Sequence, residues 1–239
     1  MRIAIVCDIH GNRTAFEAVL ADLREISPDL ILHGGDLADG GSDPASIVDQ
    51  IRDLQWPGVL GNTDEMLARP ESLEQFASET PAMAAFIGPI REMAAAARET
   101  LGEERLTWLG ALPMTESREN KALCHANPES AWRAPNPEAS EQDFAKHFGS
   151  LDVRIVVYGH IHRSFLRNAG GKIIANSGSV SLSYDGDPRA SYLLIDEGRP
   201  EIRRVAYDVD REIAAMKQAA RSHWEWIARI LKTASPQMP

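Results

Sequence analysis

The first segment that carries structural information is Ile3-Ala4-Ile5-Val6-Cys7-Asp8-Ile9-His10-Gly11-Asn12. It opens with five successive apolar residues, which is typical of a short strand buried on both faces. Apolar side chains then recur at helical spacing between Asn12 and Ile26. The segment therefore predicts a buried strand followed by an amphipathic helix, with Asp8 and His10 just past the end of the strand.

Similar units follow along the chain. Leu30-Ile31-Leu32 is predicted to be a buried strand, Asp43 and Pro44 begin a helix, and Val59-Leu60 is expected to form a short third strand. Residues 65–112 are helix-prone and rich in alanine. We expect this segment to form several helices, inserted into the fold as a cap.

The second half of the chain is rich in predicted strands. They are a hairpin over 114–124 and strands over 153–158, 164–168, 172–175, 191–195 and 201–206. Helices are expected over 141–148 and, at the end of the chain, over 208–232. Early strand-helix-strand units followed by hairpins predict two mixed sheets packed together, with helices outside, in one domain over residues 1–239.

The composition is that of an ordinary globular protein of 239 residues, 44% apolar and 25% charged. The net charge of −10 disfavours nonspecific binding to nucleic acids. No apolar run approaches the roughly 20 residues that a bilayer requires, so we expect no membrane association. Asp8 interrupts the first apolar run too early for a secretory signal, which predicts a cytoplasmic protein with reduced thiols at Cys7 and Cys124.

Side chains suited to metal binding follow five of the predicted strands. They are Asp8 with His10, Asp36, Asn62, His125, and His160 with His162. In open α/β architectures ligands collect outside the carboxyl ends of strands, so these groups predict one shared site. Carboxylate, imidazole and amide together suit borderline divalent cations better than Ca²⁺ or Mg²⁺, which favour all-oxygen shells.

The order of these blocks resembles the calcineurin-like metallophosphoesterase superfamily, whose motifs are D-x-H, G-D, G-N-H-D/E, H and G-H-x-H. The resemblance spans residues 3–195 and is greatest to small bacterial phosphoesterases, which are similar at residues 8–12, 176–180 and 186–192. It implies an α/β fold, a four-layer α-β-β-α sandwich of two mixed sheets with a helical insertion.

The resemblance also implies two divalent metal ions that share a hydroxide and stabilise charge on a phosphoryl group. Carried over position by position, it assigns seven residues: Asp8, His10 and His162 to one ion, Asn62, His125 and His160 to the other, and Asp36 to both. Mn, Fe, Zn, Ni and Co all suit this ligand set, so the identity of the metal stays open.

One position departs from the family pattern. Where many members have G-N-H-D/E, this chain has Gly61-Asn62-Thr63-Asp64, so the histidine that serves as acid for the leaving group is absent. The hydroxyl of Thr63 cannot replace it, because its pKa lies far from neutrality. We therefore expect better activity on esters with good leaving groups, or a substitute acid. His33 and Asp64 are the candidates, and Asp64 is also expected to orient the Thr63 turn.

The resulting hypothesis is a metal-dependent hydrolase of small phosphoric esters, a phosphodiesterase or a phosphatase, with nucleotides among the candidate substrates. The predicted catalytic residues are Asp36, Asn62 and Asp64, and the predicted substrate contacts are Asn12, Thr63 and His33. The alternative is a catalytically weak scaffold of the same fold that binds protein partners. Trp226 falls outside the apolar stripe of the last helix, so we expect it to be available for contacts in a homodimer.

Overall fold

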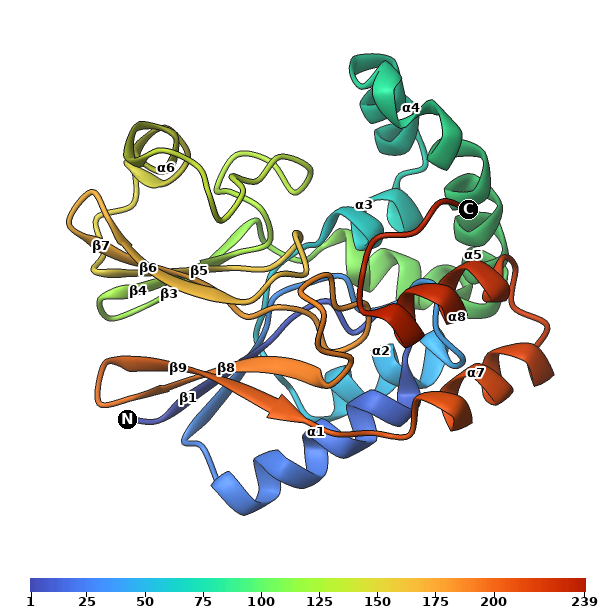
Figure 1. The fold of residues 1–239 in the computed structure, drawn as a ribbon, viewed down its shortest axis with the longest axis horizontal. Helices are drawn as coiled ribbons and strands as arrows, with labels where there is room; N and C mark the ends of the chain where they lie inside the picture. The colour runs from blue at the N-terminus through green and yellow to red at the C-terminus, as the bar shows by residue number, and fades with distance from the viewer.

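Two mixed sheets lie one above the other in the computed structural model, which describes residues 1–239 (Figure 1). The first sheet has the order β2-β1-β8-β9, formed by Leu30–His33, Ile3–Val6, Ala190–Asp196 and Arg199–Val205. The second has the order β3-β4-β5-β7-β6, formed by Thr115–Arg118, Lys121–Cys124, Ile155–Tyr158, Lys172–Asn176 and Phe165–Ala169. Each sheet contains parallel and antiparallel pairs, which confirms the prediction of two mixed sheets.

The core between the sheets follows from the alternation of side chains along each strand. In β1, Ile3 and Ile5 pack in one cluster with Ile155 and Val157 of β5, so these side chains fill the space between the sheets. Val6, pointing the other way, belongs to a second cluster. Because both faces of β1 and β5 are buried, the sequences of these two strands are apolar without interruption.

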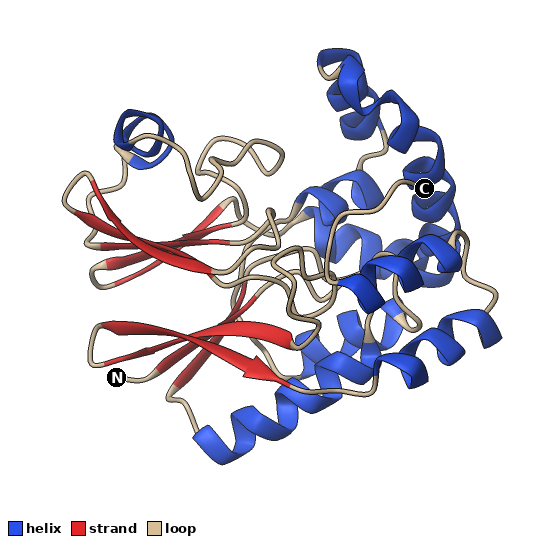
Figure 2. Cartoon of the chain, viewed as in Figure 1, coloured by secondary structure: helices blue, strands red, loops and turns tan.

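Helices cover the outer faces of both sheets and complete four layers. Helix α1 (Arg13–Ile26) lies beneath the first sheet and α6 (Glu141–Phe148) above the second (Figure 2). The remaining helices gather at one end of the sandwich: α2 (Pro44–Asp53), α3 (Asn62–Ala68), α4 (Glu71–Glu79), the 3₁₀ helix Pro81–Met83, α5 (Ala84–Gly110), α7 (Val209–Gln218) and α8 (Trp224–Thr233). No helix combines the length and apolar character needed to cross a bilayer.

Two predicted elements are wrong. Val59-Leu60 does not form a strand, because this segment joins the first sheet only through a single bridge between Gly58 and His33. The helix predicted over 208–232 is two helices, since Ala220 and His223 adopt left-handed backbone conformations at φ 49° and 56°. The apolar period continues across this break, so periodicity alone could not detect it.

The break also corrects the prediction for Trp226. The turn between α7 and α8 directs Trp226 inward, where it is 9% exposed and its ring lies 6.0 Å from that of Phe86. Its Nε1–H donates to the carbonyl of Gln237 at 2.9 Å. Trp226 is therefore not free for the dimer contact expected from the helical stripe.

Candidate metal centre

The structure brings all seven predicted metal ligands together at one end of the two sheets. They come from the loops after β1, β2, β4 and β5 and from the first turn of α3. Residues as far apart in the sequence as Asp8 and His162 thus meet in one site. The carboxyl ends of parallel strands meet at the same edge of each sheet, which is why these loops converge.

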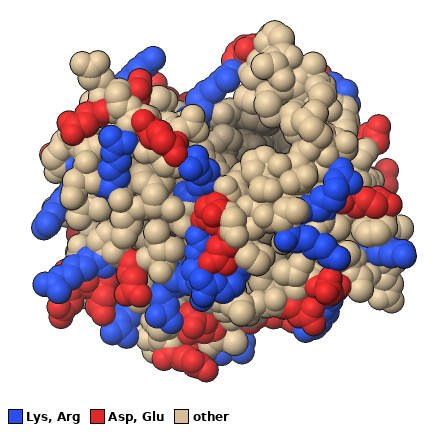
Figure 3. All heavy atoms as spheres, in the orientation of Figure 1, with Lys and Arg blue, Asp and Glu red and all other residues tan.

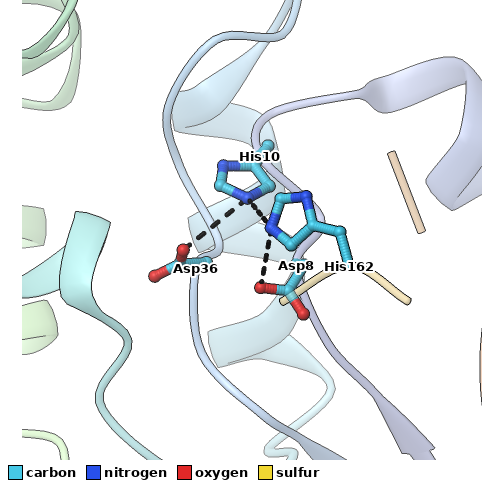
Figure 4. A group of neighbouring side chains, drawn as sticks. All are labelled: Asp8, His10, Asp36 and His162. Carbon is cyan, nitrogen blue, oxygen red and sulfur yellow. Dashed lines mark hydrogen bonds and ion pairs between the residues drawn. The ribbon is translucent and has the colours of Figure 1, made fainter. Parts of the chain in front are cut away.

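The first group of ligands is shown in Figure 4. The Nε2 atoms of His10 and His162 lie 3.2 Å apart, and Nε2 of His162 lies 3.3 Å from Oδ1 of Asp8. Asp36 completes the group, and one ligand atom from each of the four residues lies within 4.8 Å of the others. All four side chains are buried. Two carboxylates and two imidazoles directed at one point form a ligand set suited to a borderline divalent cation.

The second group is formed by Asn62, His125 and His160. Oδ1 of Asn62 lies 2.9 Å from Nε2 of His125 and 2.8 Å from Nδ1 of His160. The Nδ1–H of His125 donates to the carbonyl of Gly34 at 2.8 Å, and this bond directs its Nε2 toward Asn62. The amide oxygen of Asn62 and the two imidazoles thus converge on one place.

Asp36 lies between the two groups. Its Oδ2 is 3.6 Å from Nε2 of His10, and its Oδ1 is 3.5 Å from Nε2 of His125. The backbone N–H of Thr63 donates to Oδ1 at 2.9 Å and holds the carboxylate in this orientation. One carboxylate thus faces two separate sets of ligand atoms.

Burial keeps several of these imidazoles uncharged. It lowers the pKa of His10 to about 4 and the pKa of His160 to about 3. The Nδ1–H of His162 donates to the carbonyl of Leu182 at 2.7 Å, which leaves Nε2 of that ring as the acceptor. Neutral imidazoles with a hydrogen-bonded second nitrogen are the form in which histidine binds metal.

The backbone that carries the ligands is strained. Asp8, His10, Asp36, His160 and His162 all have positive φ values, between 49° and 66°. Non-glycine residues rarely adopt this conformation, and such strain concentrates at functional sites. His160 and His162 both lie in the loop after β5, and they reach different ligand groups, as the resemblance implied.

Close approach of the loops explains the glycine before Asn62. A Cβ on Gly61 would overlap Oδ1 and the backbone nitrogen of Asp36. The turn at Gly61 is held by Asp64, whose Oδ2 accepts its N–H at 3.1 Å. Asp64 is completely buried and also accepts the backbone N–H groups of Asp36 and Leu37, at 2.7 and 2.9 Å. These contacts agree with the predicted role of Asp64 in orienting the Thr63 turn.

Two predicted substrate contacts lie away from the open part of the site. Asn12 is the N-cap of α1: its Oδ1 accepts the N–H of Ala15 at 2.9 Å, and its amide donates to Ser181. His33 is completely buried beside Trp108, with ring centroids 6.2 Å apart, and neither ring nitrogen has a partner. Burial lowers the pKa of His33 to about 3, so its ring is uncharged near neutrality and cannot act as an imidazolium acid.

A cavity of about 270 Å³ opens beside the ligands and contains a residue that the sequence interpretation missed. Asp39 lines this cavity, is only 5% exposed, and has no partner for its Oδ1. Thr63 lines it too, with an unpartnered Oγ1, in agreement with the predicted substrate contact. The sequence did contain a signal for Asp39, because it is a second acidic residue in the loop after β2, three positions after Asp36.

A two-sheet sandwich with Asp, Asn and His ligands at its strand ends defines a class of metal-dependent phosphoesterases. The chain belongs to the calcineurin-like phosphoesterase superfamily, since the model of that domain matches residues 1–199. It is 29% identical over 245 residues to the uncharacterised protein MJ0912 of Methanocaldococcus jannaschii, covering 93% of this chain and 94% of that protein.

Two further comparisons agree with this assignment. A probable cyclic nucleotide phosphodiesterase of Synechococcus sp. is 26% identical over 190 residues, which cover 70% of this chain and 71% of that protein. The crystal structure of a metallophosphoesterase from Sphaerobacter thermophilus is similar with a TM-score of 0.77 at 25% identity, covering 98% of this chain and all of the other.

Proposed function

We propose that this protein hydrolyses small phosphoric esters with two divalent metal ions. The position of Asp36 carries the proposal, because its two oxygens face two separate groups of ligand atoms at 3.6 and 3.5 Å. The superfamily assignment supports ester hydrolysis. The Synechococcus relative, named a probable cyclic nucleotide phosphodiesterase, supports phosphodiesters as substrates.

The donor set fits such ions. Asp8, His10 and His162 would hold one ion, Asn62, His125 and His160 the other, with Asp36 shared between them. Divalent cations bound here supply Lewis acidity and a hydroxide nucleophile at neutral pH. The protein's own part is to orient these ligands through hydrogen bonds from neighbouring residues. The backbone N–H of Thr63, for example, donates to Oδ1 of Asp36.

Asp39 is our candidate for the proton donor to the leaving group. Burial is the main cause that raises the pKa of Asp39 to about 7 in the metal-free protein, and the charge of Asp36 adds to it. A general acid works best when its pKa lies near the working pH. In this proposal Asp39 Oδ1 holds the proton that passes to the leaving oxygen, and the hydroxyl of Thr63 donates a hydrogen bond to the phosphoryl group.

The test is reconstitution of the metal-free protein. Chelator-treated protein should not hydrolyse bis(p-nitrophenyl) phosphate or p-nitrophenyl phosphate, and activity should return as about two equivalents of a divalent cation bind. Inactivity with Mn, Fe, Zn, Ni and Co alike would contradict the proposal. The scaffold alternative gains no support from the site, because all seven ligand positions keep residues able to bind metal.

A further inference from the structure

The cavity beside the metal ligands is polar on one side and apolar on the other. Eleven of its nineteen lining residues are apolar or aromatic. They come from the helices α3, α4, α5 and α8, from the 3₁₀ helix Pro81–Met83, and from the loops after β4 and β7. They include Met66, Phe76, Met83, Trp132, Trp226 and Ile230. Figure 3 shows the molecule hollowed beside these helices, with mainly uncharged atoms around the hollow.

The indole N–H groups of the two lining tryptophans are already bonded. The Nε1–H of Trp132 donates to Oε2 of Glu65 at 2.8 Å, and the Nε1–H of Trp226 donates to the carbonyl of Gln237. Phe76 stacks on Trp132, with ring centroids 4.7 Å apart and an interplanar angle of 28°. The indoles therefore offer the cavity their apolar rings and no free donor.

The cavity has no cationic side chain in its lining. Arg133 lies over the ring of Phe76 at 5.0 Å, but its guanidinium bonds to Glu79 and Thr80 and lines a neighbouring hollow. The carboxyl groups of Asp36 and Asp39, which also line the cavity, offer an anion no counter-ion. A second phosphate or a carboxylate on the substrate would lose its hydration here without gaining a counter-ion, which is costly.

We infer that the apolar side of this cavity binds the organic group of the substrate. The preferred substrates are phosphoesters with one compact apolar or aromatic group and no charge beyond the reacting phosphate. An apolar cavity of about 150 Å³ holds benzene, so about 270 Å³ accommodates a ring carrying a short alkyl chain. This inference rests on the proposed function, because it assigns the substrate class of the same site.

A series of aryl phosphates whose phenols have nearly the same acidity tests this substrate preference. Phenyl, 4-methylphenyl, 4-ethylphenyl and 4-propylphenyl phosphates differ in apolar surface and hardly in the acidity of the phenol. With the metal-loaded protein we expect kcat/KM to rise about three- to fourfold per added carbon until the cavity is full. The 4-carboxyphenyl ester should be at least about tenfold poorer than the 4-ethyl ester, although its phenol is the better leaving group.

Failure of this inference is distinguishable from failure of the proposed function. If neither p-nitrophenyl ester is hydrolysed with any of the five cations, ester hydrolysis itself is refuted. If those esters are hydrolysed but kcat/KM is flat or falls along the alkyl series, or the carboxylate ester is preferred, only the substrate class is refuted.

A matched pair of variants tests whether the preference for longer alkyl chains arises in this cavity. Met83 lines the cavity and is the N-cap residue of α5, where serine is favourable, so Met83→Ser should fold normally. Ala85→Ser is the control, because Ala85 is exposed and does not line the cavity. We expect Met83→Ser to lower kcat/KM for the 4-propylphenyl ester about threefold relative to the phenyl ester, and Ala85→Ser to leave this ratio unchanged. Equal ratios in both variants would overturn the assignment of this cavity.

Discussion

Oδ2 of Asp64 accepts the backbone N–H of Asp36 at 2.7 Å, so the residue that follows Thr63 holds the loop of the central carboxylate. The two residues lie 28 positions apart. Through this bond and those to Leu37 and Gly61, Asp64 ties the loop after β2 to the start of α3. The position of Asp36 therefore depends on a side chain that does not line the cavity.

We predict that Asp64→Asn weakens metal binding about 10- to 100-fold, because the amide cannot accept all three N–H groups and Asp36 shifts. Stability should fall by about 1–3 kcal/mol. Calorimetric titration with Mn²⁺ well below the unfolding temperature measures the affinity. Asp143→Asn is the control, since Asp143 occupies the same third position of α6 and accepts the N–H of Ser140 on the surface. An unchanged Mn²⁺ affinity in Asp64→Asn would refute the positioning role.

We predict that Asp36→Asn reduces bound metal from about two ions to one or none and abolishes hydrolysis, since an amide is a poor bridge between cations. Elemental analysis of the reconstituted variant measures this stoichiometry. Asp196→Asn, on the surface beside Arg2, should keep both ions. Two ions retained in Asp36→Asn would show that another group spans the site.

We predict that Asp39→Asn impairs esters with poor leaving groups selectively. Loss of a general acid typically costs about 10²–10⁴ in rate where the leaving oxygen needs a proton, and much less where it does not. Alkyl and phenyl esters should therefore slow far more than p-nitrophenyl esters. The slope of log kcat against the pKa of the leaving alcohol should become steeper in the variant. If these plots have the same slope for wild type and variant, Asp39 is excluded as the proton donor.

We predict a pH-dependent contribution to stability from Asp185, away from the metal ligands. Burial opposes ionisation of Asp185, but hydrogen bonds from Arg204 and Ser183 outweigh it and lower its pKa to about 2. A depressed pKa stabilises the fold above the unfolded value near 4, and this contribution disappears as the pH falls from about 4 to 2. Solvent screening reduces the effect to about 1 kcal/mol.

Chemical denaturation of Asp185→Asn should therefore show a loss of about 1 kcal/mol at pH 7 that shrinks below pH 4. Glu201→Gln is the control, because Glu201 lies on β9 of the same molecule but is largely exposed. A difference that persists unchanged at pH 3 would mean that the carboxylate charge is not its source.

Much of the fold was predictable because it depends on neighbours in sequence. The continuous apolar runs of β1 and β5 and the helical period of α1 are local patterns, and the second-half strands and α6 follow the predictions within about two residues. The break after α7 was not predictable, since the apolar stripe runs through it. Residue type alone could not show that Asn12 caps α1 or separate the positioning role expected of Asp64 from a catalytic one, because cap and positioning contacts use the same residue types as catalysis.

The amino-acid sequence alone determined the architecture, the family and the set of side chains available for metal binding, because these follow from local periodicity and from the order of short motifs. Tertiary structure decided which of these side chains face one another, that Asp39 shares their cavity, and that Trp226 turns inward. Those outcomes arise from contacts between residues as far apart as His10 and His162, and only the packing of the whole chain sets such contacts.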